Sequence, residues 1–130
     1  MLNTGNVNQR DLILFSEPYD EKNYHGGIRR FESLSWLDLE ELFRLNVVDG
    51  EDRQNCSPSV QEVREFMKEH PIFKAHGYAV SPKRDDYRVS IEGVQCGSGF
   101  DLDDVVAFFT VFHDPDELSV DRDGIYCWFD

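Results

Sequence analysis

The stretch from Phe73 to Cys96 reads FKAHGYAVSPKRDDYRVSIEGVQC and predicts the central pair of strands. Residues 73–81 and 87–96 are rich in aromatic and β-branched side chains, and the polar segment 82–86 separates them. Two such runs around a short polar loop are typical of an antiparallel hairpin. We therefore interpret the rest of the chain around a central hairpin.

The side chains of this hairpin predict its register. Pairing Val80 with Val89 places both on one face, which a half-buried antiparallel pair requires. The same register puts His76 opposite Gly93 on that core face, with Tyr78 beside it. The opposite face, which we expect to contact water, carries Ala79, Ser81, Arg88, Ser90 and Glu92.

Three helices are predicted from apolar residues at three- and four-residue spacing, in segments 36–47, 57–70 and 102–112. Ser35 and Asp101 precede two of them, and both residue types cap helix N-termini. The 102–112 segment is apolar over most of its surface, so we expect it to be buried on more than one side. A strand is the alternative interpretation of this segment, because Val and Phe also favour sheets.

The flanking segments complete an α+β domain. Residues 1–10 are polar and lack periodicity, so we expect a flexible N-terminus. Segments 12–15 and 125–129 predict short strands, and 28–31 predicts either a brief strand or the approach to a helix. The order strand, helix, helix, hairpin, helix, strand indicates one globular α+β domain over 11–130. We expect a small antiparallel or mixed sheet with about three helices packed on one face.

The composition argues against several classes of protein. The chain has 130 residues, 40% of them hydrophobic, so we expect a packed core and exclude general disorder. No apolar run approaches the roughly 18 residues of a membrane helix, so no membrane partner is expected. The net charge of −13, from 26 acidic and 13 basic residues, argues against direct binding to nucleic acid.

The cysteines point to a reducing compartment. Cys56, Cys96 and Cys127 are odd in number, and no signal peptide is visible, so we expect three free thiols in a cytoplasmic protein. Neither these cysteines nor the four histidines stand at metal-ligand spacing. We therefore expect no cofactor and no bound metal.

The strongest local feature is charge, because segment 101–130 contains nine acidic residues and a single basic one, Arg122. Such a surface suits a basic protein, since complementary charge raises association rates and selects partners. We therefore expect a non-enzymatic interaction or inhibitor module, with a solvated acidic surface as the alternative. The residues expected to contact the partner are Asp103, Asp104, Asp114, Asp116, Glu117, Asp121 and Asp123.

A faint calcium-loop pattern overlaps this region, with matching residue types at Ser119, Asp121, Asp123, Gly124 and Asp130. The first position is a serine, and Tyr126 stands where a small branched apolar residue is expected. The segment is better interpreted as a turn followed by a strand.

The alternative function is a small-molecule-binding domain or a small enzyme. Its pocket would lie between the sheet and the third helix, near His76, Tyr78, Tyr87 and Cys96. Cys96 stands at a strand–helix junction, where a helix N-terminus lowers a thiol pKa, and His76 or His113 is the candidate base. The acidic start of that helix disfavours a thiolate, so no catalytic residue is assigned.

Overall fold

The computed structural model describes residues 1–130 as one antiparallel sheet accompanied by four α-helices. The sheet order is β1-β2-β3-β5-β4. The strands are β1 (Ile28–Leu34), β2 (Lys74–Val80), β3 (Val89–Cys96), β4 (Glu117–Asp121) and β5 (Gly124–Trp128). The helices are α1 (Val7–Phe15), α2 (Trp36–Arg44), α3 (Val60–Glu69) and α4 (Leu102–Val111), with 3-10 turns at Thr4–Asn6 and Glu21–Asn23.

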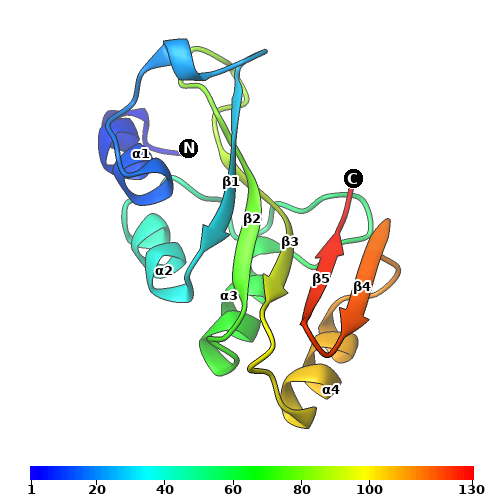
Figure 1. Ribbon diagram of the computed structural model, residues 1–130. Coiled ribbons are helices and arrows are strands. Elements are labelled where there is room, and N and C mark those ends of the chain that lie inside the picture. The colour runs from blue at the N-terminus through cyan, green and yellow to red at the C-terminus, as the bar shows by residue number, and fades with distance from the viewer.

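The sheet has one covered face and one open face. Figure 1 shows α3 and α4 behind the strands, and no helix in front of β2, β3 or β5. The covered face supplies Phe73, Val89, Ile91, Ile125 and Cys127 to a buried core. The predicted α+β class is therefore confirmed, with a sheet that is antiparallel throughout and with four α-helices instead of about three.

The predicted hairpin is present, but its register is wrong over half of its length. His76 lies opposite Gly93 as predicted, whereas Val89 pairs with Ala79 and not with Val80. The register shifts by one residue after His76, and Glu92 is the extra, unpaired residue on β3. This is a β-bulge, which places an additional residue on one strand of an antiparallel pair.

The bulge changes which side chains face the core. Ala75 and Ala79 are fully buried and take the core positions on β2. His76 and Tyr78 therefore lie on the open face, although the uninterrupted alternation predicted them on the core face. Gly77 permits the close approach of the two strands, because a Cβ there would lie 1.9 Å from the Ser90 carbonyl oxygen.

The three predicted helices are confirmed, and their caps follow the sequence. The Ser35 hydroxyl accepts a hydrogen bond from the Asp38 backbone N–H at 3.2 Å, and α2 begins at Trp36, directly after Ser35. Reciprocal capping boxes open α3, through Ser59 with Glu62, and α4, through Asp101 with Asp104. Each cap supplies partners for backbone N–H groups that the helix itself cannot satisfy.

The expected burial of α4 on more than one side is wrong. Phe108 is its only fully buried residue, whereas Leu102, Val106 and Phe109 are exposed. The helix packs against α3 on one flank and leaves the opposite flank without a covering element.

The N-terminal segment differs most from the prediction. Residues 1–10 are expected to be flexible and 12–15 to be a strand, whereas Thr4–Asn6 form a 3-10 turn and Val7–Phe15 form α1. The two buried residues of α1 are charged, Arg10 and Asp11, so hydrophobic periodicity gives no sign of its buried face. For this reason the helix is invisible to a search for apolar stripes.

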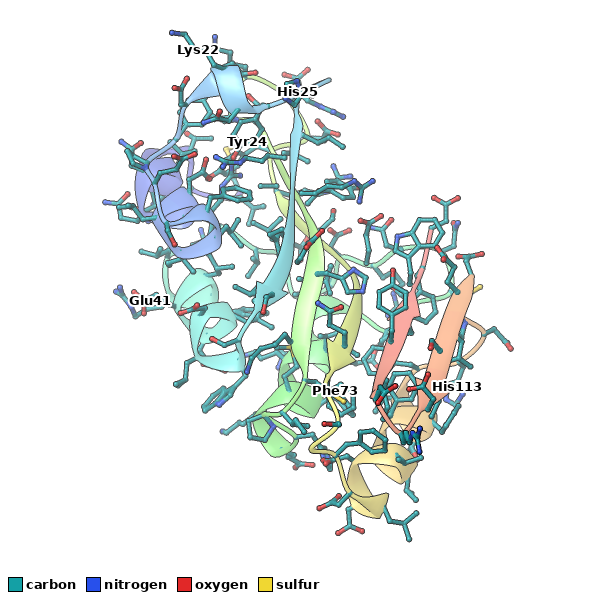
Figure 2. The ribbon with its side chains drawn as sticks, in the orientation of Figure 1. Lys22, Tyr24, His25, Glu41, Phe73 and His113 are labelled. Atoms are coloured by element: carbon teal, nitrogen blue, oxygen red, sulfur yellow. The ribbon has the colours of Figure 1, made fainter.

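A buried polar network attaches α1 to the sheet. The Arg10 guanidinium lies 2.8 Å from an Asp11 oxygen and donates to the Val80 carbonyl at 2.8 Å and the Tyr24 hydroxyl at 2.7 Å. Tyr24 in turn donates to Asp11 at 2.6 Å, and the guanidinium lies 4.7 Å from the centre of the Tyr87 ring. Figure 2 shows Tyr24 between α1 and the start of β1.

The remaining strands complete the sheet. β1 pairs antiparallel with β2, so segment 28–31 forms a strand and not the approach to a helix. The expected strand at 125–129 corresponds to β5, and β4, which was not predicted, joins β5 through a tight turn. None of the helices has the length and hydropathy that crossing a membrane requires.

Candidate functional site

The acidic residues predicted to bind a partner are spread over three elements of the C-terminal third. Asp103 and Asp104 lie in the first turn of α4, and Asp114 and Asp116 lie in the loop before β4. Glu117 and Asp121 are the two ends of β4, and Asp123 lies in the turn that follows. Part of the set therefore lies on the β4–β5 hairpin, and the seven residues do not form one compact cluster.

Three of these carboxylates, Asp104, Asp116 and Asp121, accept hydrogen bonds from backbone N–H groups. The Asp104 carboxylate accepts a hydrogen bond from the Asp101 backbone N–H at 3.0 Å and lies 2.7 Å from Nδ1 of His70. Burial raises the pKa of Asp104, but these hydrogen bonds outweigh burial and hold the pKa below its usual value. Asp116 accepts a hydrogen bond from the Asp130 backbone N–H at 2.7 Å. Asp104 is therefore the least available of the set for a partner.

The β4 strand is the most exposed acidic element. All five of its residues are exposed, and it has a hydrogen-bonded neighbour, β5, on one side. Glu117, Ser119 and Asp121 share the open face, because Ser119 lies opposite Tyr126 and Glu117 opposite Trp128. Acidic side chains thus line the outer border of the open face.

The calcium-loop pattern does not form a calcium loop. Ser119 and Asp121 belong to β4, and Asp123 and Gly124 belong to the tight turn and the start of β5. The Asp121 carboxylate accepts a hydrogen bond from the Asp123 backbone N–H at 2.8 Å. No group of three or more His, Cys, Asp or Glu side chains in the chain is arranged to hold a metal ion.

The residues of the alternative pocket do not converge. Tyr87 lies by Arg10 and donates to the Asn3 carbonyl at 3.1 Å, at the other end of the hairpin from Cys96. Cys96 packs against the core, and burial raises the pKa of its thiol. The predicted site between the sheet and α4 is therefore wrong, because the bulge places His76 on the open face instead.

A cavity of about 300 Å³ does exist on the open face, beside His76. The His76 ring stacks on Tyr126 with 5.1 Å between ring centres, and its Nε2 lies 2.8 Å from the Cys127 carbonyl oxygen. Since a carbonyl only accepts hydrogen bonds, Nε2 carries the proton and Nδ1 is left as an acceptor. Burial lowers the pKa of His76, which keeps the ring neutral at pH 7.

Glu92, the bulged residue, forms another wall of this cavity. Its side chain is buried, and its carboxylate is bonded to the Arg30 guanidinium and to the Trp128 indole N–H, the latter at 3.2 Å. Arg30 is 60% exposed, so one partner of this buried carboxylate is exchangeable with solvent. The cavity therefore combines a fixed neutral imidazole with a buried ion pair.

A shallower hollow of about 570 Å³ adjoins this cavity, since Gln95 and Tyr126 line both. Lys74 lies on its wall together with Asp121 and Asp123. The hollow connects the open-face cavity to the acidic border at β4.

Sequence reasoning missed Arg30, Glu92, Tyr126 and Trp128 as members of this site. A usable signal was present in segment 124–128, where Tyr126 and Trp128 alternate with the buried Ile125 and Cys127. Alternation in a strand places the two aromatic residues on the face opposite the core.

Comparison of the chain with protein families, with curated proteins and with solved structures finds no match. The function must therefore be inferred from the chemistry and exposure of these surfaces.

Proposed function

We propose that this protein is a non-enzymatic, cytoplasmic interaction module that binds a basic partner protein through the acidic surface of its C-terminal third. The observation that carries the proposal is the exposure of Asp114, Asp116, Glu117, Asp121 and Asp123 on and around β4, with Arg122 as the sole basic residue of 101–130. Their charges are open to solvent, which suits long-range attraction of a positively charged surface.

The test begins with retention of a cellular protein on the immobilised chain at low salt and its elution by salt. Screening acts over about 8–10 Å at physiological ionic strength, so the affinity for the eluted protein should fall steeply as salt rises. Converting Asp103, Asp114, Asp116 and Glu117 to their amides should slow association more than it speeds dissociation.

A matched control separates this surface from net charge. Glu51, Glu65, Glu69 and Asp85 are also exposed, and converting them to their amides removes the same charge elsewhere. The control variant should retain the wild-type association rate to within about twofold, because the attraction depends on charge near the contact. Equal slowing in the two variants, or no dependence on salt, argues against the proposal.

The open-face cavity supports a second candidate function, the binding of a small polar molecule. A ligand there would lie beside the His76 ring, the Arg30 guanidinium and the buried Glu92 carboxylate. Benzamidine and benzoate are suitable probes, because the cation competes for Glu92 and the anion pairs with Arg30. A shift of the Trp128 indole resonance with one probe supports this candidate, and no shift with either one argues against it.

A further inference from the structure

The outer edge of β4 is an unpaired strand edge. β4 pairs with β5 on one side, and it is the last strand in the sheet order. An edge strand presents backbone N–H and C=O groups that another strand can use. A protein segment in extended conformation can therefore extend this sheet beyond β4.

The two faces of β4 have different chemistry. Leu118 and Val120 point to the covered side, because they lie opposite Cys127 and Ile125, which are buried in the core. Even so, Leu118 is 50% exposed and Val120 is 40% exposed. The covered side of the sheet thus ends in an apolar strip that no element of this chain covers.

Helix α4 carries a second exposed apolar strip. Ala107, Thr110 and Val111 line a hollow shared with α3, so this flank of α4 faces α3. Helical periodicity places Leu102 and Phe109 on the opposite flank, and both are exposed. The molecule therefore has two exposed apolar strips, one on the covered side of β4 and one on the flank of α4 that faces away from α3.

A second copy of this chain is a poor occupant of the edge. Antiparallel pairing of two β4 strands about Ser119 would place Glu117 of one copy opposite Asp121 of the other. Both residues lie on the open face, and like charges directly opposite one another destabilise a strand pair. The same two carboxylates favour positively charged side chains at the facing positions.

We propose that the partner adds a strand to β4, with basic and apolar residues alternating along that strand. Lysine or arginine side chains on the open face would pair with Glu117 and Asp121, and apolar side chains on the covered face would complete the strip of Leu118 and Val120. This proposal rests on the proposed function, and it adds the mode of binding and the sequence pattern of the partner.

The direct probe is a short synthetic peptide in which lysine and valine alternate. Its control has the same composition, with the lysines grouped at one end and the valines at the other. The alternating peptide should bind about tenfold more tightly than the grouped one, a difference of about 1.4 kcal/mol. Binding should slow hydrogen exchange at β4 amides and leave the exchange at β1, the other edge strand, unchanged.

Three matched variants assign the contacts. Glu117→Gln with Asp121→Asn should weaken binding of the alternating peptide. The control, Glu51→Gln with Asp85→Asn, removes the same charge away from the acidic surface and should not weaken binding. Leu118→Thr with Val120→Thr places β-branched residues at both positions, which suits a strand. This variant should also weaken binding of the alternating peptide, without affecting the grouped peptide. All six positions are exposed, so the fold should be retained.

Failure of this proposal is distinct from failure of the proposed function. If a basic partner binds with dependence on salt and on the acidic residues, but β4 exchange is unchanged or the two peptides bind equally, strand addition is wrong and the interaction module stands. If Glu117→Gln with Asp121→Asn dimerises and neither peptide binds the wild type, the carboxylates only prevent self-pairing, and strand addition is again wrong.

Discussion

Gly93 packs so closely against the Cys127 carbonyl that a Cβ at this position would lie 2.0 Å from the oxygen. The same carbonyl oxygen lies 2.8 Å from Nε2 of His76, and the Cβ would also lie 2.7 Å from that nitrogen. Gly93 therefore determines how near β3 lies to β5 and leaves room for the hydrogen bond of His76.

Gly93→Ala should destabilise the protein by about 3 kcal/mol, because the methyl group meets backbone that cannot move independently. Urea denaturation followed by tryptophan fluorescence measures this change. Gly97→Ala is the matched control, since no atom lies within 4 Å of a Cβ built there, and it should cost about 0.5 kcal/mol or less. Equal stability of the two variants would contradict the close packing of Gly93.

Arg10→Ala should be among the most destabilising single substitutions in the chain. It leaves the buried Asp11 carboxylate without its guanidinium partner, which typically costs about 3–5 kcal/mol. Tyr24→Phe removes one hydroxyl from the same network and should cost about 1–3 kcal/mol. Equilibrium unfolding in urea gives both values.

The control for this network is an exposed ion pair. Arg44 is bonded to Glu41 on the surface of α2, and Arg44→Ala should cost less than about 1 kcal/mol. A stability loss for Arg10→Ala as small as that for Arg44→Ala would show that α1 does not depend on the buried network.

His76 should make the protein less stable as the pH falls from 7 to 5. Burial lowers its pKa below the unfolded value of 6.5, so the unfolded chain binds the additional proton first. The contribution of neutral His76 to the free energy of unfolding is fully present above pH 6.5. This contribution is lost as the pH falls from there toward the lower pKa of the folded state. His76→Gln keeps a donor for the Cys127 carbonyl but has no such titration.

Urea midpoints at pH 7 and pH 5 provide the measurement. The difference between the two midpoints should be smaller for His76→Gln than for the wild type. An identical difference in the two proteins would mean that His76 is solvated in the folded state. Asp104 titrates in a separate window, since its lowered pKa confers stability that is lost only as the pH falls through acidic values below 4.

The three thiols should react with a disulfide reagent in a fixed order. Cys56 is exposed and should react first, and Cys96 is half-buried with a raised pKa, so it should follow more slowly. Cys127 is buried, and burial raises its pKa to about 11, so it should react only on unfolding. Time-resolved labelling with mass spectrometry shows the order, and Cys56→Ser should remove the fast phase. Labelling of Cys127 in the native protein would contradict its burial.

The sequence predicts three of the four α-helices because their signals are local. Ser35, Ser59 and Asp101 each cap a helix through contacts with a residue three positions later, and such pairs are readable without tertiary information. Pairing of β2 with β3 was also predicted, since one polar turn connects the two strands. The class of the fold follows from these elements.

What the sequence could not predict depends on distant contacts. The bulge at Glu92 shifts the register of β3 against β2, and a period-two pattern assumes that no such irregularity occurs. Arg10 is a core residue only because Asp11, Tyr24 and the Val80 carbonyl surround it. A buried charge with long-range partners therefore looks like a surface residue in the sequence.

The arrangement of the candidate sites also depends on contacts between residues that are distant in the sequence. The acidic segment was identified correctly as a run of charge, but its division between α4, a loop and an edge strand is a property of the fold. His76 was identified as unusual on the premise that it faced the core. The structure instead gives it an open-face cavity with Glu92 and Trp128, which come from β3 and β5.

The two strands of the β4–β5 hairpin have unequal resistance to opening. β5 is held in place by its buried residues Ile125 and Cys127 and by the Phe129 N–H, which donates to the Glu92 carbonyl at 2.7 Å. All five residues of β4 are exposed, and β5 is the one strand that pairs with it, so β4 should be the first strand of the sheet to separate. The acidic edge then belongs to the part of the sheet that opens first, and a partner seated there would slow proteolysis within β4 far more than proteolysis of the remaining sheet.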